Sequence, residues 1–182
     1  MKRAIIAPPT LAPTALAELK AWLGISTSRD DAELTGLIRT ALELCEGFIG
    51  TLPLVSPCEE VLPAIGDWQA LATWPVKAIT GVSAVALDGT RTALAASDYE
   101  IDIDAEGGGR LRLTRPLDQT RVAVRFTAGL AEGWDTLPDA IQQGLVRWAA
   151  HQHRTRDSDK AMAGPPASVA ALWRPWRRMR LA

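Results

Sequence analysis

The sequence has few of the residues that extracellular and membrane proteins depend on. Its 182 residues include two cysteines, Cys45 and Cys58, which are too few for a disulfide framework and lack the spacing of a structural zinc site. No apolar run reaches the about 18 residues that a membrane-spanning helix needs. The opening segment is broken by Pro8 and Pro9 and does not predict a signal peptide. We therefore expect a soluble protein of a reducing cytoplasm.

The sequence motifs of common enzyme classes are also missing. There is no GxSxG or HExxH motif and no Ser-His-Asp order. The glycines at 107–109 lack the GxGxxG spacing and no helix follows them, so a hairpin turn is expected there. His151 and His153 stand two residues apart, which on a helix directs them roughly 200° apart and favours surface histidines over metal ligands. We therefore expect no enzyme, no catalytic, cofactor-binding or metal-binding residues, and no cofactor.

Two cysteines and a pair of glutamates are further candidate reactive groups. Cys45 falls within an apolar helical stripe and is expected to be a small core residue. Cys58 is expected in a loop, where its thiol could be more reactive. Glu59 and Glu60 are expected at solvated cap or loop positions.

Charge is distributed unevenly along the chain. The net charge is -1, from 20 basic and 21 acidic side chains. Residues 147–182 contain eight basic and two acidic side chains, so they carry +6 and the preceding residues carry -7. Such an asymmetry indicates a docking or polyanion-binding tail, with a solvated terminus as the alternative.

Hydrophobic periodicity predicts helices at both ends of the chain and strands between them. Apolar side chains at helical spacing predict helices over about 14–23, 30–49 and 138–154, and a short last one over 169–173. The expected caps are Thr14, Asp30 with its capping-box partner Glu33, and Ser168 at the starts, with Gly24 and Gly50 at the ends.

Alternation with a period of two predicts antiparallel strands over about 66–127. Asp88-Gly89 is a strong hairpin-turn signal. An acidic row at 100, 102 and 104 is expected to face arginines at 110 and 112 across two strands. The predicted fold is α+β, a small helical bundle with an inserted antiparallel β-sheet or hairpin region and a C-terminal extended arm. The predicted body spans 1–155, and a flexible linker with a docking arm spans 156–182.

The last ten residues interleave tryptophan and arginine. These residue types dominate interface hot spots and combine apolar area, cation–π contact and charge. Docking into a protein and gripping a nucleic-acid backbone both fit, whereas the prolines at 165, 166 and 175 disfavour a continuous membrane helix. The alternative is that the tryptophans fold back on the body. The candidate docking residues are Leu172, Trp173, Arg174, Trp176, Arg177, Arg178 and Arg180.

An ordered series of short motifs extends over nearly the whole chain. They are Thr-x-Ala-x-x-Glu-Leu-Lys-x-x-Leu-Gly-Ile from Thr14, Asp-Asp-Ala-Glu-Leu-x-x-Leu-Ile-x-x-Ala from Asp30, Trp-Pro-Val-Lys-Ala-Ile-Thr-Gly-Val from Trp74, Tyr-x-Ile-Asp from Tyr99, Val-Arg-Phe-Thr-Ala-Gly from Val124, Leu-Pro-x-x-Ile from Leu137, and Ala-Ala-Leu-Trp-Arg-Pro-Trp-Arg from Ala170. In this order the chain resembles the head–tail connector (adaptor) family of tailed bacteriophages and phage-like gene transfer agents.

The resemblance implies a structural protein of the virion or particle, located at the head–tail interface and assembled in the bacterial cytoplasm. Members of this family form a ring, commonly of twelve subunits, below the portal protein. Packaged double-stranded DNA passes through the ring without sequence-specific contact, and a stopper or tail-completion protein binds on the other side. The C-terminal segment reaches the portal, which here corresponds to about residues 163–182. No membrane partner is implied.

Two other functions remain open. A DNA-binding module would grip the phosphate backbone with the basic Trp/Arg tail, and its binding would depend steeply on salt. An enzyme would use His151 and His153 with a metal ion. We also expect that removal of residues 165–182 leaves a folded body.

Overall fold

Long-range contacts divide the chain into two units, each built from segments distant in sequence. The computed structural model describes residues 3–156 and 164–178. The strand unit comprises Met1–Pro9 and Val55–Leu130, and the helical unit comprises Thr10–Leu54 and Ala131–Ala182. The α+β class, with antiparallel strands inserted between helices, is confirmed.

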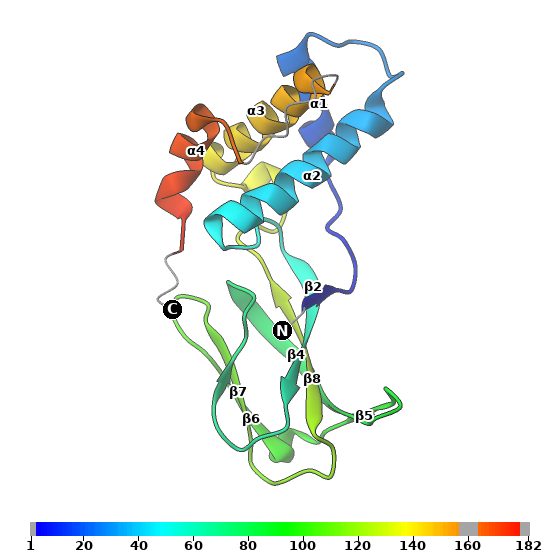
Figure 1. Cartoon of the computed structure of the whole chain (residues 1–182), viewed down its shortest axis with the longest axis vertical. Helices are drawn as coiled ribbons and strands as arrows, with labels where there is room; N and C mark the ends of the chain where they lie inside the picture. The colour runs from blue at the N-terminus through cyan, green and yellow to red at the C-terminus, as the bar shows by residue number, and fades with distance from the viewer. Residues whose placement is uncertain (1–2, 157–163, 179–182) are drawn as a thin grey trace. The chain divides into compact units, whose positions relative to one another are not determined.

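The helical unit contains four α-helices among the described residues, and α3 contacts each of the other three (Figure 1). Its elements are α1 (Pro13–Leu23), α2 (Asp31–Ile49), η2 (Trp134–Thr136), α3 (Asp139–Thr155), α4 (Ala167–Trp173) and η3 (Arg174–Trp176). Its buried side chains are mainly aliphatic residues at the predicted helical spacing, joined by tryptophans. No helix in the described residues is long and apolar enough to span a membrane.

The helix ends agree with the sequence signals only in part. Gly24 and Gly50 both have φ of 73° and end α1 and α2, as predicted. Asp30 occupies the N-cap position of α2, but its side chain makes no capping hydrogen bond, so the expected capping box is absent. Thr14 lies inside α1, because Pro13 occupies the first turn, and its hydroxyl instead donates to Asp135 at 2.6 Å.

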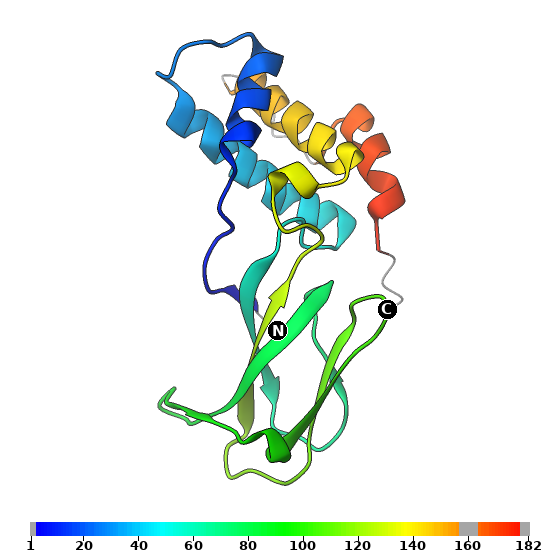
Figure 2. The ribbon, with the colours of Figure 1, turned by 180° about the vertical axis from the view of Figure 1, so that it is seen from behind.

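The strand unit contains two antiparallel sheets. The five-stranded sheet has the order β1-β2-β8-β4-β5 and the three-stranded sheet the order β3-β7-β6. Their strands are β1 (Arg3–Ile5), β2 (Ser56–Pro63), β3 (Gln69–Ala70), β4 (Val76–Val85), β5 (Arg91–Ala93), β6 (Tyr99–Ile103), β7 (Gly109–Leu113) and β8 (Arg121–Ala128), and η1 (Ala96–Asp98) precedes β6. Figure 2 shows the sheets from the opposite side to Figure 1.

β8 is the central strand of the larger sheet, since it pairs with β2 on one side and β4 on the other. Its Val122, Val124 and Phe126 are buried, as the alternation predicts. The structure differs from the predicted limits of the strand region, because pairing begins at Ser56 and includes β1 near the N-terminus. These pairings are long-range, so local periodicity does not reveal them.

Both predicted hairpin turns are present. Asp88-Gly89 lies between β4 and β5, where Gly89 has φ of 89° and the Asp88 carboxylate accepts from the Thr90 N–H at 2.8 Å. The glycines at 107–109 join β6 to β7. At this turn a Cβ on Gly107 would lie 2.5 Å from Pro75 Cβ, so only glycine fits against the neighbouring segment.

The predicted cross-strand charge row is confirmed for two of its three acids, whereas Asp104 lies in the turn and accepts from the N–H groups of Glu106 and Gly108. Glu100 lies opposite Arg112 and Asp102 opposite Arg110, and both pairs form salt bridges, the first at 2.8 Å. All four side chains are largely exposed, so each pair contributes a few tenths of a kcal/mol to stability at most.

Candidate protein-docking site

The C-terminal Trp/Arg segment is folded against the helical unit, where the sequence predicted an extended arm. α4 begins after Pro166, whose carbonyl accepts from the N–H groups of Val169 and Ala170, both at 2.9 Å. Ser168 lies within this helix and does not cap it. Pro175 lacks the N–H that a continuing α-helix needs, and the chain tightens into η3.

Trp173 is the residue that anchors this segment to the helical unit. Its side chain is 0% exposed, and its Nε1 donates to the carbonyl of Ile141 at 3.3 Å. Its ring centroid lies 6.0 Å from that of Phe48 and 6.5 Å from that of Trp148. Of the two arrangements left open by the sequence, folding back is the one adopted by Trp173.

A glycine in the middle of α3 makes the room that the Trp173 indole occupies. A Cβ built on Gly144 would lie 2.1 Å from Trp173 Nε1. The sequence prediction missed Gly144, Phe48 and Trp148 as parts of this site. The available signal was Gly144 itself, since a glycine inside a strongly helical pattern often has a packing reason.

The segment beyond Trp173 also contacts the end of α2. The Arg178 N–H donates to the carbonyl of Ile49 at 2.8 Å, next to the αL residue Gly50. The Arg177 guanidinium carbon lies 5.7 Å from the centroid of the Phe48 ring. These contacts involve main chain and ring faces, so they leave the charged ends of the side chains at the surface.

The seven predicted docking residues therefore have different environments. Arg174, Trp176, Arg177 and Arg178 are exposed, Leu172 is half-buried, Trp173 is buried, and Arg180 lies outside the described residues. Trp176 is 37% exposed although it is a large aromatic residue. The structure thus brings three arginines and one tryptophan together on one exposed end of the helical unit.

The charge of the helical unit is separated along its sequence. Residues 10–54 and 131–146 hold three basic and nine acidic side chains, a net charge of -6. Residues 147–182 carry +6, so the helical unit as a whole is neutral. The residues of the strand unit sum to -1, from nine basic and ten acidic side chains. The excess of acidic side chains before residue 147 therefore lies mainly in the helical unit, in residues 10–54 and 131–146.

The histidine pair does not form a metal site with other residues of the described chain. His153 Nε2 lies 2.8 Å from Arg156 Nη1, and the His151 ring lies 6.5 Å from that of Trp148. In residues 3–156 and 164–178 no three His, Cys, Asp or Glu side chains are grouped closely enough to hold a metal ion.

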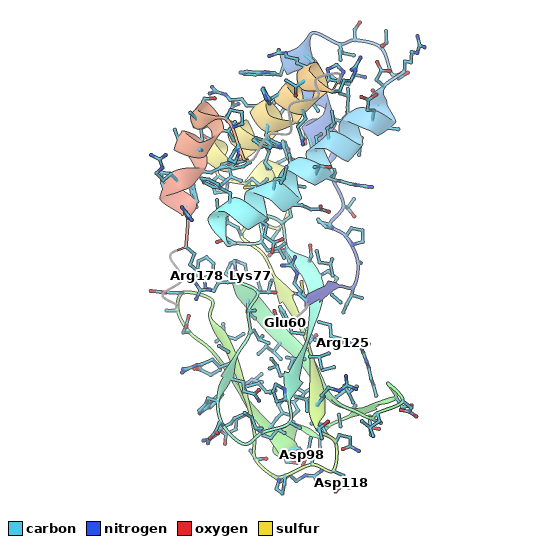
Figure 3. The ribbon with its side chains drawn as sticks, viewed as in Figure 1. Glu60, Lys77, Asp98, Asp118, Arg125 and Arg178 are labelled. Atoms are coloured by element: carbon cyan, nitrogen blue, oxygen red, sulfur yellow. The ribbon has the colours of Figure 1, made fainter. Side chains whose placement is uncertain are left out.

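The expectations for Cys58 and for the two glutamates are wrong. Cys58 is fully buried in β2, and its Sγ donates to the Ser56 carbonyl at 3.5 Å. Glu60, which is labelled in Figure 3 and also lies in β2, is fully buried. Its carboxylate accepts hydrogen bonds from Ala72 N, Thr73 N and Thr73 Oγ1. These groups are buried because β2 is an interior strand, paired with β1 and β8.

Two further groups have structural roles. Glu59 is largely buried and pairs with Arg91 and with Arg125, the latter at 3.2 Å. Burial, with a smaller contribution from Glu46, raises the pKa of the Cys45 thiol far above its usual value, so that thiol stays protonated and is a core residue as expected.

The chain is similar over its whole length to chains in solved structures of gene transfer agent particles. A chain from the neck of an empty particle computed with C6 symmetry is 27% identical with a TM-score of 0.80. Chains from the virion of a native particle and from the neck of a native particle computed with C12 symmetry are each 27% identical with a TM-score of 0.75. Each match covers 100% of this chain and 98% of the other. No protein-family model matches the chain, and no curated protein matches it.

Proposed function

We propose that this chain is a structural component of the neck of a phage-like particle. Copies of it form a ring that joins the portal protein of the capsid to a stopper or tail-completion protein. Packaged double-stranded DNA passes through the ring. The observation that carries the proposal is the full-length match, at 27% identity and a TM-score of 0.80, to a chain of a gene transfer agent neck.

The exposed end of the C-terminal segment is the surface proposed to dock on the portal. Arg174, Trp176 and Arg177 combine charge with aromatic area, which is the composition of interface hot spots. Repetition of this contact around a ring gives avidity, because each further contact forms at a high effective concentration. Trp173 supports this surface from within the unit and does not itself reach a partner.

The acidic part of the helical unit supports the proposed passage of DNA. Residues 10–54 and 131–146 carry a net charge of -6, which disfavours tight binding of a phosphate backbone. A channel for DNA must let the duplex slide, and an acidic lining achieves this.

Binding of the full chain to purified portal rings from the same particle tests the proposal. We expect the wild-type protein to bind the rings and the triple variant Arg174→Glu, Trp176→Ala, Arg177→Glu to lose binding while it keeps the wild-type unfolding midpoint. An exposed charge reversal in the strand unit, Arg121→Glu, is the matched control. Wild-type protein that does not bind portal rings would contradict the proposal.

A DNA-binding module remains the second candidate, because the same exposed arginines could contact phosphates. It predicts that the isolated protein binds duplex DNA, that affinity falls steeply with salt, and that the triple variant loses this binding. For the ring component we expect only weak binding that does not depend on these three residues.

A further inference from the structure

The helical unit contains an aromatic–cation pair, Trp22 and Arg147, that has no acidic partner among the described residues. Trp22 in α1 is 43% exposed, and the Arg147 guanidinium carbon, from α3, lies 5.4 Å from its ring centroid. Arg147 Nε is shielded from solvent and has no hydrogen-bond partner, and no carboxylate of the described chain forms a salt bridge with Arg147. The guanidinium therefore has no ion pair among the described residues, and a carboxylate of another molecule at its terminal nitrogens would neutralise its charge.

The arginines that stack on Trp68 show the contrast. Their guanidinium carbons lie 5.6 Å and 5.1 Å from the Trp68 centroid. Both are already paired with carboxylates, Arg110 with Asp102 and Arg112 with Glu100. The Trp22–Arg147 pair, which we call the α1–α3 seam, lacks this compensation.

The outward face of α2 has the complementary composition. Glu43 is exposed and has no hydrogen-bond or salt-bridge partner among the described residues, and the adjacent Leu44 is 42% exposed. Gly36 and Gly47 lie on the same stripe as Glu43, and a Cβ on either would have nothing within 4 Å. Interior glycines weaken a helix, yet no neighbour in the described chain requires them. They leave room for close approach of another molecule to Glu43 and Leu44.

The seam and the α2 face lie on different sides of the helical unit. Arg147 is two residues from both Leu145 and Ala149, so it points roughly 200° away from these buried side chains. α2 packs against α1 and α3 through its own buried stripe, which leaves Glu43 on the side away from them. In Figure 1 α2 lies in front of α1, and in Figure 2 α1 lies in front.

We propose that the α2 face of one copy of this chain packs against the α1–α3 seam of the next copy. Glu43 then pairs with Arg147 of the neighbouring copy, and Leu44 packs on its Trp22. A closed ring needs such a contact between two different faces, because each subunit must offer one face to each neighbour. A second copy is the indicated occupant because this chain carries complementary groups on the two faces, a carboxylate and a guanidinium that form no ion pair among the described residues. The inference rests on the proposed ring.

Charge reversal tests the pairing in the full chain. We expect Arg147→Glu and Glu43→Arg each to raise the protein concentration needed for assembly about 30-fold or more, since each places like charges together. The double variant restores the opposite charges and is expected to assemble near the wild-type concentration. Assembly is measured as mass distribution by mass photometry, with and without purified portal rings, and unfolding midpoints establish that each variant is folded. Arg121→Glu is the control for a change of net charge.

The outcomes separate the interface from the ring itself. If the wild-type protein assembles and both single variants assemble as well as the wild type, the proposed interface is wrong, whereas the proposed ring is unaffected. The interface is also overturned if the folded double variant stays as impaired as the single variants. If the wild-type protein forms no ring alone or on portal rings, the proposed function fails.

A cross-link provides a readout that does not depend on charge. In the variant with both Glu43→Cys and Arg147→Cys, mild oxidation of assembled protein is expected to give a ladder of covalent oligomers. Cys45 and Cys58 are buried, so we expect that they do not form cross-links. Each single cysteine variant is a matched control and should stop at dimers or monomers. An assembled double-cysteine protein that gives no ladder would overturn the proposal.

Discussion

The Trp173 indole fills the space that a side chain on Gly144 would need. The two residues lie on α4 and α3, and a Cβ on Gly144 would be 2.1 Å from Trp173 Nε1. This contact makes the C-terminal segment part of the helical core. It also changes the expected effect of truncation: removal of residues 165–182 takes away a fully buried tryptophan, so we expect a destabilised helical unit, where the sequence suggested an intact body.

Gly144→Ala should lower the free energy of unfolding of the helical unit by about 1–3 kcal/mol, because the added methyl group overlaps the indole. Gly36→Ala is the matched control, since it is also a helix glycine but nothing lies near its Cβ. It should stabilise the monomer by about 1 kcal/mol. Denaturant unfolding at concentrations below assembly measures both. Equal effects of the two substitutions would contradict the role of Gly144.

The two tryptophans of the C-terminal segment should separate stability from docking. Trp173→Ala is expected to cost about 3–5 kcal/mol of stability, as for other buried tryptophans. Trp176→Ala should change stability by less than about 0.5 kcal/mol, because its side chain is partly exposed, yet weaken binding to portal rings. Chemical unfolding and ring binding of both variants test this. The assignment is wrong if Trp176→Ala unfolds the protein or leaves ring binding at the wild-type level.

Features that depend on local sequence could be predicted, whereas features that depend on long-range packing could not. Gly24, Gly50 and the Asp88-Gly89 turn were predictable, because each depends on a few adjacent residues. The burial of Trp173 was not, since it depends on a glycine 29 positions earlier in another helix. The exposed positions of the docking segment could be expected from their charge. The burial of Trp173 could be predicted only with knowledge that α4 packs against α3.

Glu60→Ala should destabilise the strand unit by at least about 2 kcal/mol, because it leaves the buried N–H and hydroxyl groups of Thr73 without their acceptor. Glu106→Ala removes an exposed acid from the same unit and is expected to have little effect. Thermal or denaturant unfolding distinguishes them. A wild-type stability for Glu60→Ala would show that water replaces the carboxyl group.

Stability of the strand unit should fall at acidic pH, in part through Asp98. Its carboxylate accepts two hydrogen bonds from the Arg115 guanidinium, at 2.8 Å and 2.9 Å, and this pairing lowers the pKa of Asp98 below its usual value of 3.8. A carboxyl group with a lowered folded-state pKa stabilises the fold above its unfolded-state pKa. That contribution is lost as pH falls through the lower folded-state value.

We therefore expect Asp98→Asn to lower stability at neutral pH and to flatten the decline between about pH 5 and pH 2. Asp67→Asn, which removes another exposed acid of the strand unit, is the matched control for the loss of one carboxylate. The Asp98 effect should shrink at high salt, because the pair is partly exposed and screened. Unfolding free energies across this pH range measure the difference. Parallel profiles for Asp98→Asn and the wild type would mean that the pKa of Asp98 is the same in the folded and the unfolded chain. The ion pair with Arg115 would then make no contribution to the stability of the fold.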